Sequence, residues 1–331
     1  MLRCFFLLTA LLIASPATAQ TPAREFFGGE PLPAALNSEP IGFYSRGCMA
    51  GGVAMPPDGP YWQSMRLTRN RQWGLPILVD FLQTLARDAA AQDGWPGLLV
   101  GDMAQPRGGP MLTGHASHQI GLDADIWLTP MPSHRLSERE REDLSAAIIT
   151  EPGPHDVYNE RWTSAHGRVI RRAALDSRVE RIFVAPGIKR ALCQMFDAGD
   201  RAWLSKVRPY YGHNYHFHVR LSCPPGTRCR SQDPPPAGDG CGSDLDWWFT
   251  DEPYASSSEP PPPDRPLTMD DLPSACRTVL DAEAVAGAMT MRQAFAAGVG
   301  TGGTIAPAPV TGNAAGGAEP ARLPQARPGL F

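Results

Sequence analysis

Two short segments of this chain hold side chains that could act together on a metal ion. Residues 114–125 and 213–218 contain five of the eight histidines. Imidazole nitrogens and carboxylate oxygens ligate divalent transition metals, and a catalytic zinc ion takes three such ligands and leaves one position open. A further histidine close by can exchange a proton with the reacting water. The candidate side chains in these two segments are His115, His118, Asp125, His213, His216 and His218.

Alternating apolar and polar residues predict a strand in the second segment. Side chains two apart on a strand share a face, so His216 and His218 should point the same way, roughly 6–7 Å apart. That spacing suits one imidazole that binds a metal and a neighbour that acts as a general base. We expect the apolar residues that alternate with them to face the core: Tyr215, Phe217 and Val219.

Residues 122–128 alternate in the same manner and predict a second strand. Asp125 would lie on its polar face with Asp123 and Trp127, within reach of a histidine from the preceding loop. A lone His-x-His pair is usually a surface feature, and Asp123 and Asp125 by themselves could be solvated carboxylates. The presence of both segments in one chain favours a catalytic metal site over these alternatives.

The remaining pattern predicts an α+β fold, with a small, mostly antiparallel sheet and flanking helices. Pro76 suits the first turn of a helix in which Leu78, Phe81, Leu82 and Leu85 recur at helical spacing. Further expected elements are strands at 98–100 and 181–184 and a helix at 162–175.

Composition and the N-terminus indicate an exported protein without a membrane span. The 331 residues carry a formal net charge of −4, which does not favour nucleic-acid binding through a basic surface. Residues 1–19 have the features of a signal peptide: Arg3, an apolar run over 5–14, and a small-x-small cleavage site at 17–19. No later apolar run reaches the ~18 residues that span a bilayer.

Removal of the signal peptide would also remove Cys4 and leave six cysteines. An even number in an exported chain favours disulfides over free thiols. A zinc site built from cysteines is not favoured, because the chain has no CxxC pair. Spacing alone does not choose among the many pairings that six cysteines allow.

The wider pattern resembles a known group of enzymes. His118-x6-Asp125, followed far downstream by His216-x-His218, is similar to the signature of the zinc peptidases grouped with lysostaphin, D-Ala-D-Ala carboxypeptidases and hedgehog. Within that group, longer strings resemble the penicillin-insensitive murein endopeptidases of Gram-negative bacteria. The matching strings are residues 47–51, 114–119, 121–126, 181–184, 207–209, 216–220 and 238–242. The likeness covers about 37–280 and implies a hedgehog-like, D-Ala-D-Ala-peptidase-like fold braced by disulfides.

The resemblance implies a role for each candidate residue. The metal would be Zn²⁺, ligated by His118, Asp125 and His218, with His115 as a further ligand. His216 would be the general base, or would orient the water and stabilise the oxyanion, and His213 would assist it.

The histidines outside these two segments have plainer expected roles. His134 and His166 stand in polar or helical contexts, and we expect both at the surface. The resemblance implies a second, peripheral metal held by an Asp and a His in the loop before residue 162. His155 roughly matches that histidine, but Glu151 and Pro152 stand near the place of the aspartate. We therefore do not predict a second metal.

The chain divides into six expected parts: a signal peptide (1–19), an N-terminal extension (20–36), a catalytic domain (37–252), a Pro-rich linker (253–271), a segment tied back by Cys276 (272–297) and a disordered tail (298–331). The resemblance implies three disulfides: Cys48–Cys276, Cys193–Cys241 and Cys223–Cys229. The first of these would explain why the segment around Cys276 stays attached beyond the linker.

The function that the resemblance implies is zinc-dependent hydrolysis of D-alanyl–meso-diaminopimelyl cross-links in periplasmic peptidoglycan. No serine nucleophile is needed, so penicillin should not inhibit the reaction. A homodimer is a further implication. Two alternatives are a D,D-carboxypeptidase of the same group, which would release terminal D-Ala and leave cross-links intact, and a catalytically silent, zinc-stabilised binding module. The presence of His213 and His216 favours an enzyme.

Overall fold

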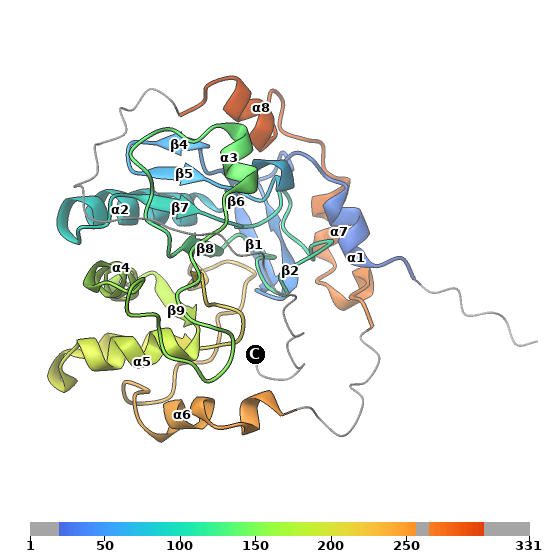
Figure 1. Cartoon of the computed structure of the whole chain (residues 1–331). Coiled ribbons are helices and arrows are strands. Elements are labelled where there is room, and N and C mark those ends of the chain that lie inside the picture. Colours follow the sequence, from blue (N-terminus) through green and yellow to red (C-terminus); the bar gives the residue numbers. More distant parts are fainter. Residues whose placement is uncertain (1–19, 256–264, 301–331) are drawn as a thin grey trace, which may run out of the picture.

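The computed structural model describes residues 20–255 and 265–300 (Figure 1). The predicted signal peptide, part of the predicted linker (256–264) and most of the predicted tail (301–331) lie outside the described residues. The α-helices are α1 (Ala23–Gly28), α2 (Pro76–Gln92), α3 (Glu138–Asp143), α4 (Ser164–Leu175), α5 (Pro186–Met195), α6 (Ser243–Asp246), α7 (Ala275–Asp281) and α8 (Met291–Ala296). The strands are β1 (Glu39–Phe43), β2 (Arg46–Ala50), β3 (Val53–Ala54), β4 (Asp58–Gly59), β5 (Trp62–Ser64), β6 (Trp73–Gly74), β7 (Leu98–Val100), β8 (Asp123–Trp127), β9 (Val179–Val184), β10 (Val207–Pro209) and β11 (His216–Leu221).

The main sheet has seven strands in the order β10-β9-β11-β8-β7-β5-β4. Four of its neighbouring pairs are antiparallel, and β10–β9 and β7–β5 are parallel. Parallel neighbours need a long connection, and α2 and α5 lie in the two connections concerned. The predicted α+β class with a mostly antiparallel sheet is therefore confirmed, and each parallel pair results from a helical crossover.

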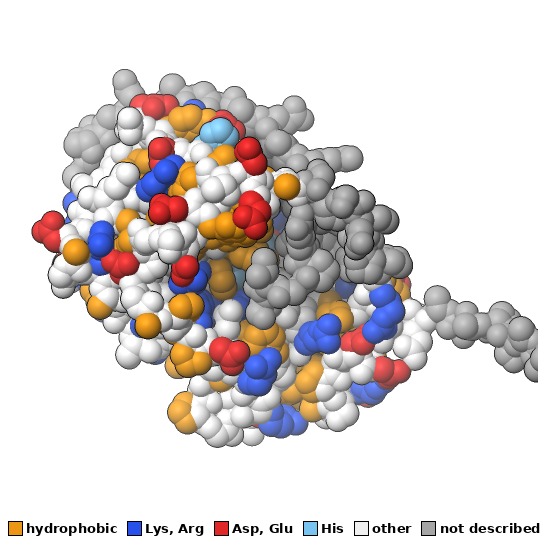
Figure 2. All heavy atoms as spheres, turned by 90° about the horizontal axis from the view of Figure 1, so that it is seen from below, with side chains coloured by type: hydrophobic (Ala, Val, Ile, Leu, Met, Phe, Trp, Pro, Cys, Tyr) orange, Lys and Arg blue, Asp and Glu red, His pale blue; other side chains and the backbone are white. Residues whose placement is uncertain are grey.

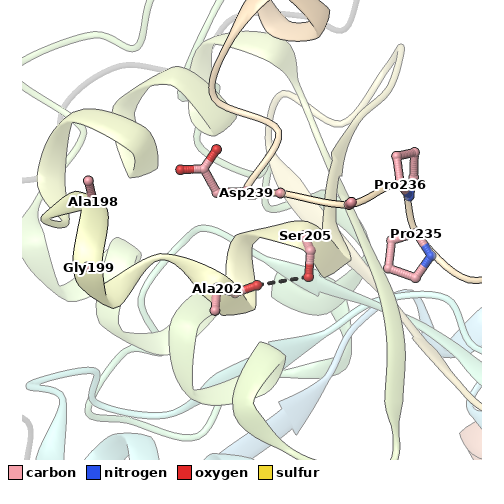
Figure 3. A pocket seen from close by; sticks show the side chains of 9 residues that line it. Ala198, Gly199, Ala202, Ser205, Pro235, Pro236 and Asp239 are labelled. Atoms are coloured by element: carbon pink, nitrogen blue, oxygen red, sulfur yellow. Dashed lines mark hydrogen bonds between the residues drawn. The ribbon is translucent and has the colours of Figure 1, made fainter.

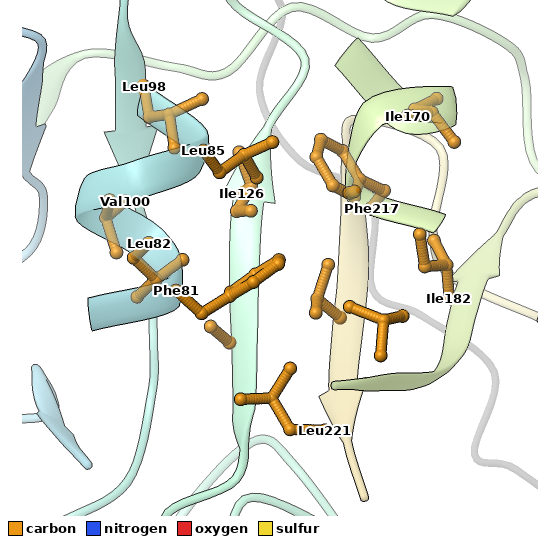
Figure 4. Packing of buried hydrophobic residues seen from close by; sticks show 14 of the residues in the cluster. Phe81, Leu82, Leu85, Leu98, Val100, Ile126, Ile170, Ile182, Phe217 and Leu221 are labelled. Carbon is orange, nitrogen blue, oxygen red and sulfur yellow. The ribbon is translucent and has the colours of Figure 1, made fainter. Parts of the chain in front are cut away.

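One face of this sheet carries the main core (Figure 4). Helix α2 begins with Pro76 at its first turn and buries Phe81, Leu82 and Leu85, as the spacing predicted. These side chains pack with apolar residues of β7, β8, β9 and β11, and α4 adds Ile170 to the same cluster. Each fully buried side chain of this size contributes about 1.5–3 kcal/mol. The core therefore fixes β8 and β11 through the apolar face of the sheet.

The opposite face of β8 and β11 is polar but also buried. The two strands pair antiparallel, with His218 directly across from Asp125 and Arg220 across from Asp123. Asp123 is 0% exposed and Asp125 4% exposed. The alternative of solvated surface carboxylates is therefore wrong. Buried carboxylates must be paired, because an isolated charge is very costly away from water.

The structure contradicts the expectation that His166 lies at the surface. His166 is buried in the first turn of α4, and its ring lies 4.8 Å from that of Trp95 and 5.2 Å from that of Trp162. Its Nε2–H donates to the Leu128 carbonyl at 3.0 Å, and its Nδ1 accepts from the Thr163 N–H at 3.1 Å. His134 is exposed, as expected.

Three disulfides brace the fold: Cys48–Cys276, Cys193–Cys241 and Cys223–Cys229. The pairing implied by the resemblance is thus confirmed. The first disulfide joins β2 to α7 within a second apolar cluster that α1 also enters through Phe27. Arg107 reinforces this junction, because its Nη1 donates to the carbonyls of Val279, Leu280 and Ala282 at the end of α7. The last carbonyls of a helix lack partners within the helix.

Charge is mixed over the face seen from below, where acidic and basic side chains are interspersed with apolar ones (Figure 2). Such a surface lacks the single-signed field that general nucleic-acid binding uses. None of the helices within 20–255 and 265–300 combines the length and the apolarity that a membrane crossing requires.

Candidate metal centre

Four histidine rings converge on Asp125, which projects from the middle of β8. Its Oδ1 lies 3.4 Å from His118 Nε2, 3.2 Å from His218 Nδ1 and 3.5 Å from His216 Nε2. Its Oδ2 lies 3.5 Å from His115 Nε2. The structure therefore brings side chains of the two histidine segments to one carboxylate. They come from the loop after β7 and from β11, the strand beside β8.

The ligand atoms of His115, His118 and Asp125 lie within 4.8 Å of one another, and this is the one group of at least three potential ligands found in the described part of the chain. His218 adjoins the group, since its ring centroid is 4.5 Å from that of His118. Such a group can hold a divalent cation.

Buried polar atoms without partners support a fit to a cation. Among the described residues, both ring nitrogens of His118, Oδ1 of Asp125 and Nδ1 of His216 are buried and make no hydrogen bond. Leaving such atoms unpaired costs about 1–3 kcal/mol each, more for a charged group. A metal ion placed among lone pairs of imidazole and carboxylate would satisfy them together. The donor set thus fits a transition metal such as zinc.

The backbone at His118 takes a conformation that few residues other than glycine adopt. Its φ is +66°, in the left-handed region. The strained turn is held by a hydrogen bond from the His118 N–H to Oδ2 of Asp123 at 3.1 Å. Because Asp123 begins β8 and Asp125 follows two residues later, the same strand fixes both the His118 backbone and the carboxylate that its ring faces.

Asp123 supports the cluster through hydrogen bonds, so it has a structural role close to the site. Its Oδ1 accepts from His218 Nε2 at 3.0 Å and from Arg220 Nε at 2.8 Å. Burial alone would raise the pKa of Asp123, but Arg220, His218 and His118 hold it well below the usual range. A carboxylate that accepts the outer N–H of a histidine fixes the tautomer and orientation of the ring. His218 therefore presents Nδ1 to Asp125.

Charges around Asp125 set the protonation states of its neighbours. Burial would raise the pKa of Asp125, but His216, His118 and His115 lower it well below the ordinary value. Burial also lowers the pKa of His216 to about 4, despite Asp125, so His216 is neutral at pH 7. For His218, burial opposes the charged form, but Asp123 and Asp125 raise its pKa above the ordinary value.

His213 lies beside the cluster, in the loop before β11. Its ring centroid is 4.9 Å from that of His216 and 5.9 Å from that of His218. Nδ1 lies 2.7 Å from the Tyr211 carbonyl, which can only accept, so Nδ1 carries the proton. Burial and the neighbouring His216 and His218 hold the pKa of His213 well below its usual range. His213 is therefore a neutral imidazole with its lone pair at Nε2.

Asp102 is a further buried carboxylate that the sequence analysis missed. Its Oδ2 accepts from Arg69 Nη1 at 3.0 Å, from Arg71 Nη1 at 3.1 Å and from His115 Nε2 at 3.1 Å. It thereby ties His115 to the turn that carries the two arginines, which includes the 3₁₀ helix η1 (Leu67–Arg69). Its place just beyond the apolar β7 was the only local signal, since loops after buried strands often carry site residues.

Tyr215 does not face the core, contrary to the expected alternation. It lies just before β11 begins, is half-buried and takes no part in the apolar cluster behind the sheet. Its ring centroid is 4.5 Å from that of His216. Burial, with Asp125 and Asp102, raises its pKa to about 12. The strict alternation therefore starts at His216, and Tyr215 belongs to the surroundings of the cluster.

A surface pocket of about 630 Å³ is lined by none of these residues. Figure 3 shows the side chains that line it. Its wall consists mainly of small residues and prolines, among them Ala202, Pro235 and Pro236. The Ser205 hydroxyl donates to the Ala202 carbonyl at 2.8 Å, and Asp239 pairs with Arg201 at 2.9 Å. The polar side chains of this pocket, Ser205 and Asp239, are thus already paired.

His155 lies in an exposed loop before α4. Within the described ranges, no group of three potential metal ligands includes it.

Comparisons with known proteins give a consistent result. A family model described as penicillin-insensitive murein endopeptidase matches residues 40–281. A Haemophilus influenzae protein of that name is 41% identical over 291 residues, which are 85% of this chain and 96% of the Haemophilus protein. A Yersinia enterocolitica protein of the same name is 40% identical over 280 residues, which are 83% of this chain and 95% of the relative. A Klebsiella pneumoniae protein of that name is 41% identical over 276 residues, which are 83% of this chain and 96% of the relative.

Proposed function

Because this chain belongs to the penicillin-insensitive murein endopeptidase family, we propose that it hydrolyses D-alanyl–meso-diaminopimelyl cross-links of peptidoglycan with the help of a zinc ion. The observation that carries the proposal is the convergence of His115, His118, His216 and His218 on Asp125. The unpartnered buried nitrogens of His118 and His216 and the Oδ1 of Asp125 suit a cation, and the neutral imidazole of His213 lies beside them.

The proposed ligands are His118, Asp125 and His218. His218 would use Nδ1, because its Nε2–H donates to Asp123. When bound, zinc supplies a Lewis acid that polarises a carbonyl and lowers the pKa of water to about 7.

His115 is proposed as an additional, weaker ligand. Its Nε2 faces both Asp125 and Asp102, at 3.5 and 3.1 Å. One nitrogen cannot donate a proton to Asp102 and ligate a metal at the same time. Ligation by His115 through Nε2 would therefore require its hydrogen bond to Asp102 to break.

The other histidines would handle the proton. Hydrolysis adds water to the D-alanyl carbonyl carbon and breaks its bond to the diaminopimelyl nitrogen. His216, neutral at pH 7, would take a proton from the attacking water at a ring nitrogen and return it to the leaving amine. His213 would assist by accepting a hydrogen bond at Nε2, since its proton is held at Nδ1 by the Tyr211 carbonyl.

No serine takes part in this chemistry, whereas β-lactams act by acylating a nucleophilic serine. Penicillin should therefore leave the reaction unaffected. The substrate also suits export to the periplasm through the predicted signal peptide 1–19. The expected division of the chain and the homodimer stay predictions.

The test is mass spectrometry of purified cross-linked muropeptide dimers after incubation with the mature protein. Penicillin is present throughout, and a chelator is added to one arm. We expect monomers without the chelator, none with it, and recovery when zinc is restored. Intact dimers that have each lost one alanine would indicate the D,D-carboxypeptidase instead. No change with folded, zinc-loaded protein would indicate the binding module.

A further inference from the structure

Three arginines lie in the turn before β6: Arg66, Arg69 and Arg71. Of these three, Arg69 has both solvent access and hydrogen-bond donors to spare. Its side chain is 48% exposed, and within the described residues only Nη1 is engaged, on Oδ2 of Asp102. Arg71 is largely buried, and its two terminal nitrogens bond Asp102 and Thr113. The terminal nitrogens of Arg66 are occupied by main-chain carbonyls.

Arg69 borders the metal centre through a short series of contacts. Its Nη1 and His115 Nε2 share Oδ2 of Asp102, at 3.0 and 3.1 Å. The same His115 nitrogen lies 3.5 Å from Oδ2 of Asp125. The guanidinium is therefore at the rim of the site, on the side of His115, and its remaining N–H groups can reach a ligand there.

Tyr215 borders the site on the side of His216. Its main-chain carbonyl accepts from the Leu128 N–H at 2.9 Å, which holds Tyr215 at the end of β8. Its hydroxyl makes no hydrogen bond to the described residues and stays protonated at neutral pH. An O–H donor next to His216 and a guanidinium linked to His115 through Asp102 thus border Asp125, because both of these histidines face its carboxylate.

Two such donors together recognise a carboxylate, because a guanidinium presents its N–H groups in a fork that matches carboxylate oxygens. The cross-link offers one at the right place. The carbon that bears the scissile amide nitrogen of the diaminopimelyl residue also bears a carboxylate, only a few covalent bonds from the reacting carbonyl.

We propose that Arg69 and Tyr215 form a subsite for this carboxylate and so place the leaving-group residue against the metal centre. This inference rests on the proposed function and identifies the part of the substrate that the site recognises. Both residues are specificity determinants here, because they touch a group that does not react. A buried or partly buried charge-assisted contact of this kind distinguishes a carboxylate from a neutral isostere.

The test compares two dimers, one with the free carboxylate and one with the same carboxylate converted to a carboxamide. We expect wild type to prefer the carboxylate about tenfold or more in kcat/KM, and Arg69→Gln to lose about 10- to 30-fold on that dimer but under threefold on the amide. Tyr215→Phe should lose about 3- to 10-fold on the carboxylate alone. Arg69→Lys should recover part of the loss. The control is Arg139→Gln, whose side chain is 91% exposed and pairs with Asp143 on α3.

Zinc content and equilibrium binding of the two dimers to chelator-treated protein serve as readouts apart from turnover. Equal losses on both dimers, or a fall in zinc content, would show that Arg69 acts only by holding Asp102 and His115, and would overturn the subsite. So would a wild type without preference for the carboxylate. If wild type cleaves neither dimer, the proposed function fails, and the binding measurement still decides whether Arg69 and Tyr215 select the carboxylate.

Discussion

Replacement of His166 by glutamine should reduce the loss of folding stability that wild type shows at acid pH. Burial lowers the pKa of His166 to about 4, from 6.5 in an exposed imidazole, although the hydrogen bond to the Leu128 carbonyl acts in the opposite direction. The folded-state pKa is depressed, so between pH 6.5 and 4 the unfolded chain binds a proton that the folded chain rejects. The stabilisation is complete above pH 6.5 and is lost as the pH falls toward 4. The loss is about 3.5 kcal/mol, at about 1.4 kcal/mol for each pKa unit.

The assay is urea unfolding of the metal-free protein, followed by tryptophan fluorescence at pH 7.5 and at pH 4.5. His166→Gln should already be less stable at pH 7.5, because it loses ring contacts with Trp95 and Trp162. Between the two pH values, the free energy of unfolding of the variant should fall by about 2–3 kcal/mol less than that of wild type. Comparing the two losses cancels the other titrating groups. His134→Gln, at an exposed position, is the matched control and should behave as wild type. Equal losses in wild type and His166→Gln would refute the reasoning.

Two further predictions concern the metal centre. Asp123→Asn weakens the hydrogen bond that orients His218, so it should raise the zinc dissociation constant about 10- to 100-fold. The constant is measured by competition with a chelating dye. An unchanged constant would show that Asp123 does not orient His218. His216→Gln should lower kcat on muropeptide dimers about 10²- to 10⁴-fold while zinc content, measured by elemental analysis, stays as in wild type; if zinc is lost as well, His216 is a ligand rather than a base.

The strands that carry the site could be predicted because their periodicity is local. Alternation over 122–128 and 215–221 predicted that Asp125 and His218 each lie on the polar face of a strand, and the structure has them directly opposite each other. The α2 helix followed in the same way from its apolar spacing. These patterns depend on neighbours in the chain, which one sequence contains in full.

The supports of the site could not be predicted, because they depend on contacts between distant segments. Asp102 and Arg69 lie 33 positions apart, and no local pattern links them. In the sequence, His166 resembles a surface residue of an amphipathic helix. In the structure it is buried because Trp95, from a distant part of the chain, packs against it. Tyr215 follows the strand alternation in sequence, but the strand begins one residue later. Each error arose where tertiary packing, rather than local spacing, decides the surroundings.

The disulfide between Cys48 and Cys276 also has a consequence for the order in which the protein is assembled. The two cysteines are 228 positions apart, and the other two bridges lie inside that span. Chains are synthesised from the N-terminus. Cys48 of β2 therefore has no disulfide partner until α7 has been made. The apolar cluster of Ile41, Cys48 and Val279 also stays incomplete until then. A single backbone cut between the two cysteines would likewise leave both fragments joined until a reductant is added.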